Sequence, residues 1–172
     1  MVNSLDKGKR LDIMKGDYTM TNVFIDCEFN EFGGDLISMA LVADDGQEFY
    51  EVLELENDEK YGSWVYANVV PWLNKDPIDK RLFQQKLWQF INQWKEVHII
   101  ADWPDDIKYF CMSLITGPGV ALNTPLKLTM QIDRELNTES SAILHNALED
   151  AKAIKHSWYR REKEMIGYGV TE

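Results

Sequence analysis

Three strand-like segments follow one another before the first helical pattern begins, and this order limits the folds open to the chain. Residues 22–29 (NVFIDCEF) form an apolar run typical of a buried strand. Residues 35–55 contain two further strand patterns, separated by the turn sequence Asp44-Asp45-Gly46. Because consecutive strands joined by short turns pair antiparallel, the sequence predicts an antiparallel three-stranded start to a sheet.

The rest of the chain alternates between helical and strand patterns. Apolar residues recur at helical spacing within residues 61–95, and a short apolar strand follows at 97–102. Pro104 stands where the first turn of the next helix would begin. Another strand pattern occupies 126–132, and an amphipathic helix follows over 145–165. This order predicts an α/β fold in which parallel strands extend the antiparallel start and helices flank the mixed sheet.

Composition indicates a globular protein with one domain. The 172 residues suit a single core, which we expect over residues 20–172, behind a flexible leader or extension at residues 1–19. No apolar run approaches the roughly 18 residues of a membrane span. Two cysteines are too few for a disulfide framework, so a cytoplasmic location is expected. The net charge of −11 excludes a broad basic face for nucleic acid.

Two carboxylates interrupt the first predicted strand. Side chains alternate along a strand, so Asp26 and Glu28 share one face while Ile25 and Cys27 point to the other. Neighbouring, partly desolvated carboxylates repel each other, and a divalent cation, which prefers oxygen ligands, relieves that repulsion. The pattern predicts a metal site, and a strand end with two solvated acids is the alternative.

Two further polar clusters stand where helices are expected to begin. Acids at a helix entry are favoured by capping and by the helix dipole, so the cluster DWPDD at residues 102–106 has a structural explanation when taken alone. In HNALED at 145–150, Asn146 is expected to cap the helix with the acid three residues later. His145 and Asp150 would then border one cleft. An imidazole near a metal-bound water is a natural general base.

Taken in order, these motifs resemble those of the DEDDh branch of the DnaQ-like 3′-5′ exonucleases, within the ribonuclease H-like superfamily. The resemblance rests on FIDCEF at residues 24–29, on the acidic helix entry ending in DIKYF at 106–110, and on His145 with Asp150 five residues later. It extends from residue 22 to about residue 160. The stretches DCEFNEFGGDLISMALVADDGQEFYEV and HNALEDAKAIKHSW are similar to the mycobacterial-type exoribonuclease subfamily, whose members are often dimeric.

The resemblance implies a metal-dependent nuclease. Asp26, Glu28 and Asp150 match metal ligands of the family, and His145 matches its general base. The implied cofactors are two divalent cations, Mg²⁺ or Mn²⁺, roughly 4 Å apart across the scissile phosphate. The implied reaction releases nucleoside monophosphates from the free 3′ end of single-stranded nucleic acid, with RNA a more probable substrate than DNA. A homodimer is the implied assembly, and no membrane is expected as a partner.

The second motif leaves a choice between two aspartates. Family members carry two apolar or aromatic residues three and four positions after this ligand, and Tyr109 and Phe110 meet that condition for Asp106. At the same distances after Asp102 stand Asp105 and Asp106. The resemblance therefore implies Asp106 as the ligand. The chain departs from the family pattern at Asp102, where asparagine is frequent, and at Asp105, where an apolar or aromatic residue is frequent.

Substrate contacts are less evident in the sequence. Phe29 is a candidate for stacking on the terminal base, with core packing as the alternative, and Asp102 is a second candidate for a substrate contact. The basic residues of the last predicted helix have two explanations, contact with the strand backbone or stabilisation of the helix C-terminus. Four tryptophans are expected in the core or in a dimer interface, namely Trp64, Trp72, Trp88 and Trp94.

Two other functions are compatible with the sequence. An exonuclease-like acidic binding module or decoy would keep the fold without turnover, although all five catalytic positions hold residues of the required type. A ribonuclease of the RNase H type would cut internally. This alternative does not explain why His145 and Asp150 stand five residues apart. Metal-dependent nucleotide release distinguishes the first alternative from an exonuclease, and a circular substrate distinguishes the second.

Overall fold

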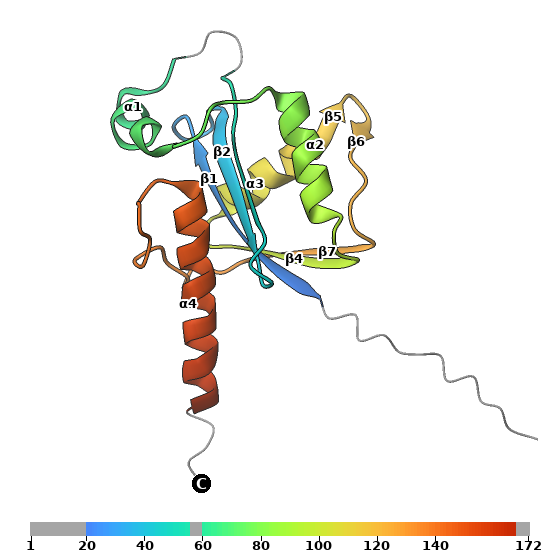
Figure 1. The fold of residues 1–172 in the computed structure, drawn as a ribbon, viewed down its shortest axis with the longest axis vertical. Coiled ribbons are helices and arrows are strands. Elements are labelled where there is room, and N and C mark those ends of the chain that lie inside the picture. The colour runs from blue at the N-terminus through green and yellow to red at the C-terminus, as the bar shows by residue number, and fades with distance from the viewer. Residues whose placement is uncertain (1–19, 56–59, 168–172) are drawn as a thin grey trace, which may run out of the picture.

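The computed structural model describes residues 20–55 and 60–167, and the leader expected at residues 1–19 lies outside this part of the chain. At its centre is a five-stranded sheet with the strand order β3-β2-β1-β4-β7 (Figure 1). The strands are β1 (Thr21–Phe29), β2 (Leu36–Ala43), β3 (Glu48–Val52), β4 (Glu96–Ala101) and β7 (Lys127–Ile132).

Strand directions give the sheet a mixed topology. β1 and β2 pair antiparallel, as do β2 and β3. β4 lies parallel to β1, and β7 lies parallel to β4. The antiparallel three-stranded start followed by parallel strands confirms the predicted α/β fold class.

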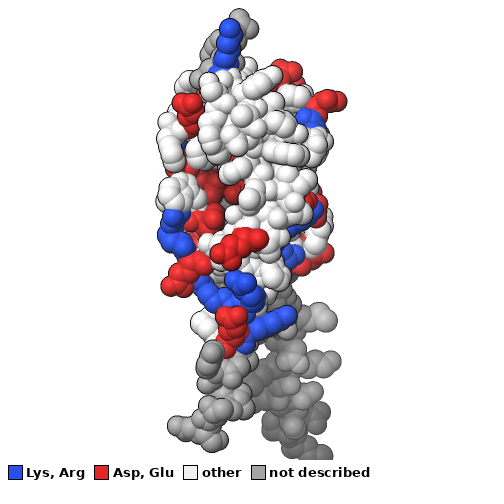
Figure 2. Space-filling view, turned by 90° about the vertical axis from the view of Figure 1, so that its left-hand side faces the viewer, with Lys and Arg blue, Asp and Glu red and all other residues white. Residues whose placement is uncertain are grey.

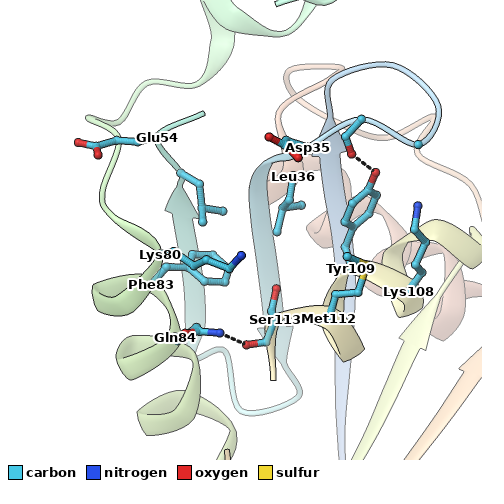
Figure 3. A pocket seen from close by; sticks show the side chains of 13 residues that line it. Asp35, Leu36, Glu54, Lys80, Phe83, Gln84, Lys108, Tyr109, Met112 and Ser113 are labelled. Atoms are coloured by element: carbon cyan, nitrogen blue, oxygen red, sulfur yellow. Dashed lines mark hydrogen bonds between the residues drawn. The ribbon is translucent and has the colours of Figure 1, made fainter. Parts of the chain in front are cut away.

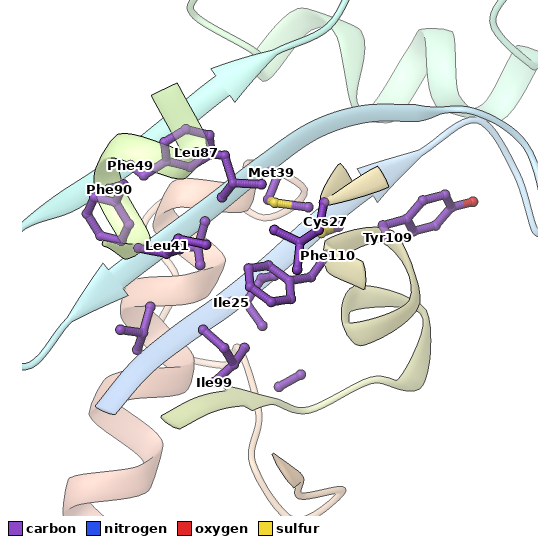
Figure 4. Close-up of a cluster of buried hydrophobic side chains, with 14 of the residues drawn as sticks. Ile25, Cys27, Met39, Leu41, Phe49, Leu87, Phe90, Ile99, Tyr109 and Phe110 are labelled. Carbon is purple, nitrogen blue, oxygen red and sulfur yellow. The ribbon is translucent and has the colours of Figure 1, made fainter. Parts of the chain in front are cut away.

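Helices cover both faces of the sheet. α2 (Lys80–Ile91) and α3 (Pro104–Ser113) pack on one face, where Ile25 and Cys27 of β1 join the largest hydrophobic cluster (Figure 4). α4 (Ala147–Gly167) packs on the other face against β1 and β2, and its C-terminal half extends beyond the sheet (Figure 1). Both faces of β1 are buried, which explains why its sequence is a nearly continuous apolar run.

The remaining elements are short. The segment before α2 forms α1 (Ser63–Asn68) and a 3₁₀ helix, η2 (Val70–Trp72). A small hairpin, β5 (Ile115–Gly117) with β6 (Val120–Ala121), lies between α3 and β7, where the sequence analysis predicted no strand. No helix in the described part of the chain has both the length and the apolarity that crossing a membrane requires.

The loop between β1 and β2 is held in one tight conformation. The Asn30 N–H donates to the Asp35 carbonyl at 2.8 Å. A Cβ at Gly34 would lie 1.7 Å from the Asn30 carbonyl oxygen, so only glycine fits there. The Tyr109 hydroxyl of α3 donates to the Gly34 carbonyl at 2.5 Å. These contacts fix the loop against α3, next to the end of β1.

Candidate active site

Five carboxylates converge at one edge of the sheet. Asp26 and Glu28 lie near the C-terminal end of β1, on the face that packs against α4. Asp102 directly follows β4, and because β1 and β4 are parallel their C-terminal ends lie at the same edge. Asp106 and Asp150 come from the first turns of α3 and α4. The structure therefore brings together residues that are far apart in the sequence.

These carboxylates line a cleft of about 810 Å³. Figure 2 shows acidic side chains inside a hollow on this side of the molecule, bordered by uncharged atoms. Among the described residues that line the cleft, six are Asp or Glu and none is Lys or Arg. The site therefore concentrates acidic side chains, and the described wall contains no Lys or Arg to offset them.

The candidate ligands form two groups. One oxygen from each of Asp26, Asp102 and Asp106 lies within 4.8 Å of the other two. In the second group, one oxygen from each of Glu28 and Asp150 and one ring nitrogen of His145 all lie within 4.8 Å of one another. Oxygen atoms and an imidazole nitrogen at this spacing suit a divalent cation in each group.

Burial and mutual repulsion disfavour ionisation in the metal-free cleft. Burial, followed by the charges of Asp106 and Glu28, raises the pKa of Asp26 well above its ordinary value. Burial and the charge of Asp150 raise the pKa of Glu28 to about 8. Burial and the charge of Asp102 raise the pKa of Asp106 to about 8. A bound cation would reverse this effect, because it stabilises the ionised form of each ligand.

Two buried carboxylate oxygens of the cleft lack hydrogen-bond partners among the described residues. Asp106 accepts the Cys27 N–H with Oδ1 at 3.1 Å, whereas its Oδ2 has no partner. Asp150 accepts the His145 N–H with Oδ2 at 2.9 Å, and its Oδ1 makes no hydrogen bond to the described residues. Burial raises the pKa of Asp150, and the nearby Ser141 side chain lowers it. Leaving a buried polar atom unpaired is costly, so each orphan oxygen is suited to a ligand that the protein itself does not supply. The donor set fits Mg²⁺ or Mn²⁺, which bind carboxylate oxygens.

The segment before α4 places His145 in the cleft. The Asn146 side chain accepts the Glu149 N–H at 3.2 Å, which confirms the predicted helix cap. His145 has a positive φ of 63°, an uncommon conformation for a residue other than glycine. Its backbone bond to Asp150 and the cap at Asn146 hold it there. The imidazole is thereby directed toward Glu28 and Asp150 rather than along the helix.

The entry to α3 separates the three aspartates that the sequence grouped together. Trp103 is the N-cap residue, and it makes no side-chain capping bond. Asp105 accepts the Trp103 indole N–H at 3.0 Å and pairs with Lys108 at 3.4 Å. Asp102 and Asp106 face Asp26 instead. The structural explanation from the sequence therefore holds for Asp105 and also applies to Asp106, which lies in the first turn of α3, whereas Asp102 precedes the helix.

Aromatic side chains surround the carboxylates, and most were not singled out in the sequence. Phe29 lies in the cleft wall but is half-buried, with its ring stacked on Tyr109 at a centroid distance of 5.1 Å. Phe32 is 83% exposed beside it. Trp64 was expected in the core or in a dimer interface, yet it is 55% exposed and its ring meets the His145 ring edge-on at 5.1 Å. Trp103 also lines the cleft.

Hydrogen bonds connect Trp64 to the end of β1. The Asn30 side chain accepts the Gly62 N–H at 2.8 Å and donates to the Lys60 carbonyl at 3.1 Å. Gly62 immediately precedes α1, the helix that carries Trp64. Asn30 therefore fixes this aromatic side chain relative to the carboxylates of β1, and no local sequence pattern reveals such a long-range contact.

A second cavity of about 190 Å³ lies on the side of the β1–β2 loop that faces α2 and α3. Figure 3 shows the Lys80 side chain pointing into it, with Phe83 on one side and Tyr109 on the other. The Gln84 amide donates to the Ser113 carbonyl at 3.0 Å along its wall. None of the site residues predicted from the sequence lines this cavity.

We expect Asp106→Asn to damage hydrolysis more than Asp102→Asn. Asparagine at position 106 keeps the bond to the Cys27 N–H but replaces the orphan oxygen by an amide nitrogen, which does not ligate a hard cation. The loss should exceed the roughly 10- to 100-fold that follows removal of outer-shell partners, whereas half-buried Asp102 should give a smaller loss. Nuclease rates at saturating Mg²⁺ measure the ranking.

Asp105→Asn is the matched control, because it changes the same helix entry outside the two ligand groups. Its rate should stay close to that of the wild type, and melting curves should show that all three variants fold. An inactive Asp102→Asn variant beside an active Asp106→Asn variant would reverse the assignment of the second motif.

Comparison with known proteins gives a partial match. Over 52 residues the chain is 46% identical to the 3′-5′ exoribonuclease Rv2179c of Mycobacterium tuberculosis strain H37Rv and to the 3′-5′ exoribonuclease MT2234.1 of strain CDC 1551. The match covers 29% of this chain and 31% of each relative. No family model matches the chain. The chain is thus similar to two proteins named as exoribonucleases over about a third of their length.

Proposed function

We propose that this protein is a metal-dependent 3′-5′ exonuclease of the DEDDh type that acts on single-stranded nucleic acid, with RNA preferred over DNA. The observation that carries the proposal is the pair of ligand groups in one cleft, each of which includes a buried carboxylate oxygen without a partner. Residues 20–172 act as one catalytic domain in this proposal, and assembly as a homodimer remains a prediction from the resemblance.

The metal ligands in this proposal are the four carboxylates that the family resemblance implied. Asp26 and Asp106 belong to the first group, and Glu28 and Asp150 belong to the second. Two Mg²⁺ or Mn²⁺ ions bound there would supply Lewis-acid stabilisation of a phosphodiester and of the oxygens that attack it and leave it. The protein's own part is to hold the four carboxylates together at one edge of the sheet, where a bound cation would favour their ionised form.

His145 is the general base in this proposal. A ring nitrogen of its imidazole accepts the proton of the attacking water, and Asp150 and Asn146 fix the backbone that carries the ring. Trp64 packs against the ring and limits its orientation. This arrangement favours an acid–base role over a purely structural one, because the ring lies in the wall of the cleft.

Exposed aromatic rings at the rim of the cleft suit the binding of single-stranded nucleic acid. Phe32, Trp64 and Trp103 all line the cleft, and aromatic faces stack on unpaired bases without sequence preference. Duplex binding normally requires many phosphate contacts to basic residues, and the described cleft wall contains none. The polarity of cleavage and the preference for RNA rest on the names of the two partial relatives.

A gel time course with 5′-labelled single-stranded RNA and DNA tests the function. In Mg²⁺ or Mn²⁺ we expect a ladder that shortens by single nucleotides from the 3′ end, faster for RNA than for matched DNA, and no products in EDTA. Asp150→Asn protein serves as the control for contaminating nucleases.

Three outcomes would contradict the proposal in different ways. Equal degradation of circular and linear strands would indicate internal cutting. Binding without product in every metal would favour the non-catalytic acidic module or decoy. Faster digestion of DNA would remove only the RNA preference.

A further inference from the structure

The acidic cleft lacks an evident partner for the phosphates that lie upstream of the bond to be cut. Metal ions would offset charge at the scissile phosphate, but the next phosphate of a strand would meet a wall whose described residues include six acids and no Lys or Arg. A strand that remains bound during successive cleavages needs a positive group near this wall.

Arg134 stands at the rim of the cleft in a fixed position. Its guanidinium carbon lies 3.6 Å from the centre of the Trp103 ring, in a cation–π contact. Its Nη1 donates to the Asp102 carbonyl at 2.9 Å. The Trp103 ring is itself held, because its indole N–H donates to Asp105 at 3.0 Å. The guanidinium is therefore positioned directly beside the ligand group that contains Asp102.

The acids that flank Arg134 in the sequence are paired with a different cation. Arg161 of α4 donates to Asp133 at 3.2 Å and to Glu135 at 2.9 Å. Arg134 is exposed. Of its five N–H donors, one makes a hydrogen bond to the described residues.

Basic residues of α4 near the cleft are engaged in other contacts. Lys152 pairs with Glu149 at 3.0 Å and with Glu48 at 3.4 Å. Lys155 donates to the carbonyl of Ala43 at 2.6 Å. Neither lysine lines the cleft, and Arg134 adjoins it through Trp103, a lining residue that its guanidinium contacts. Arg134 is thus better placed than these lysines to bind a strand phosphate that lies just beyond the carboxylate groups.

We propose that Arg134, held by Trp103 and by the Asp102 carbonyl, binds a phosphate of the nucleic-acid strand upstream of the scissile bond. This inference rests on the proposed function. Arginine suits the task, because its planar group presents parallel donors to two oxygens of one phosphate. The consequence is selectivity: the site favours a strand with an upstream phosphate over a substrate that has only the scissile one.

Two substrates separate this role from a general effect on the site. A short single-stranded oligonucleotide has upstream phosphates, whereas the p-nitrophenyl ester of a nucleoside 5′-monophosphate has only the scissile phosphodiester. We expect Arg134→Gln to lower the ratio of the two kcat/KM values, oligonucleotide over ester, by about tenfold, mainly through the KM for the oligonucleotide. Arg134→Lys should restore part of the ratio, because lysine keeps the positive charge but lacks the paired, parallel N–H donors of the guanidinium.

Arg81→Gln is the matched control, since it removes the same charge from an exposed position on α2, on the other side of the sheet. Its ratio should equal that of the wild type. Strand binding in Ca²⁺, followed by fluorescence anisotropy at several salt concentrations, gives an independent readout. Loss of one phosphate contact in Arg134→Gln should reduce the salt slope by about 0.7.

The outcomes distinguish this inference from the proposed function. Equal losses on both substrates would overturn it, because Arg134 would then act through Asp102 on the metal site. An unchanged ratio with an unchanged salt slope would also overturn it and leave the cation–π pair as packing alone. If the wild type hydrolyses neither substrate, the nuclease proposal fails, while the salt slope of strand binding still tests Arg134.

Discussion

Asp26→Asn should abolish hydrolysis and raise the melting temperature of the metal-free protein. Asp26 is affected by the whole charge cluster, because burial and then the charges of the other four carboxylates raise its pKa. An asparagine removes this repulsion when no cation is bound, but it also removes a ligand that the reaction requires. We expect a rate loss of more than about a thousandfold, as is typical when a central catalytic group is removed.

The two effects are measured separately, as nuclease rates in Mg²⁺ and as melting curves in EDTA near pH 8. Asp105→Asn is again the control, because Asp105 makes a partly exposed pair with Lys108, and such pairs contribute about 1 kcal/mol or less. A rate near that of the wild type in Asp26→Asn would refute the metal site. A lower melting temperature in EDTA would show that the carboxylate is needed for folding.

The parts of the site that could be predicted from the sequence depend on local spacing. Alternation along a strand placed Asp26 and Glu28 on one face, and the structure places both in the wall of one cleft. Capping chemistry located the start of α4 at Asn146, and with it the proximity of His145 and Asp150. In both cases a few consecutive residues determine the geometry.

The aromatic side chains at the rim of the cleft, Phe32, Trp64 and Trp103, could not be predicted in this way. Trp64 reaches the cleft because Asn30, more than thirty residues away, holds the segment before α1. Its sequence context resembles that of any partly apolar helix, so the sequence predicted a place in the core or in a dimer interface. Arg134 shows the same limitation, because only the parallel pairing of β4 and β7 places it beside Asp102 and Trp103. Contacts between distant segments determine both positions.

The fold was easier to predict than the rim, since the order of strand and helix patterns limits the topology. The antiparallel start and the later parallel strands are both present. The β5–β6 hairpin was missed because its strands are two or three residues long, too short for a periodic pattern. Gly119, with a positive φ of 71°, lies in the turn between these two strands.

Stability should fall as pH rises when no metal is present, and Mn²⁺ should remove this dependence. Glu28 and Asp106 have pKa values raised to about 8 in the folded protein, so the folded state binds protons more tightly than the unfolded state. Their contribution to stability is fully present below their ordinary pKa values and is lost as pH rises through the raised values. The melting temperature in EDTA should therefore decrease between about pH 5 and pH 9.

Mn²⁺ should act in the opposite direction, and most strongly at high pH. A cation that binds only the folded state adds RT ln(1 + [L]/Kd), about 2.7 kcal/mol at a hundredfold excess over Kd. Because protons compete for the same carboxylates, the gain should be larger at pH 8 than at pH 6. Melting curves at both pH values with fixed Mn²⁺ measure the difference, and Asp26→Asn should reduce it. An equal gain at both pH values would place the bound ion outside this cluster, because only ligands that lose protons on binding make the affinity depend on pH.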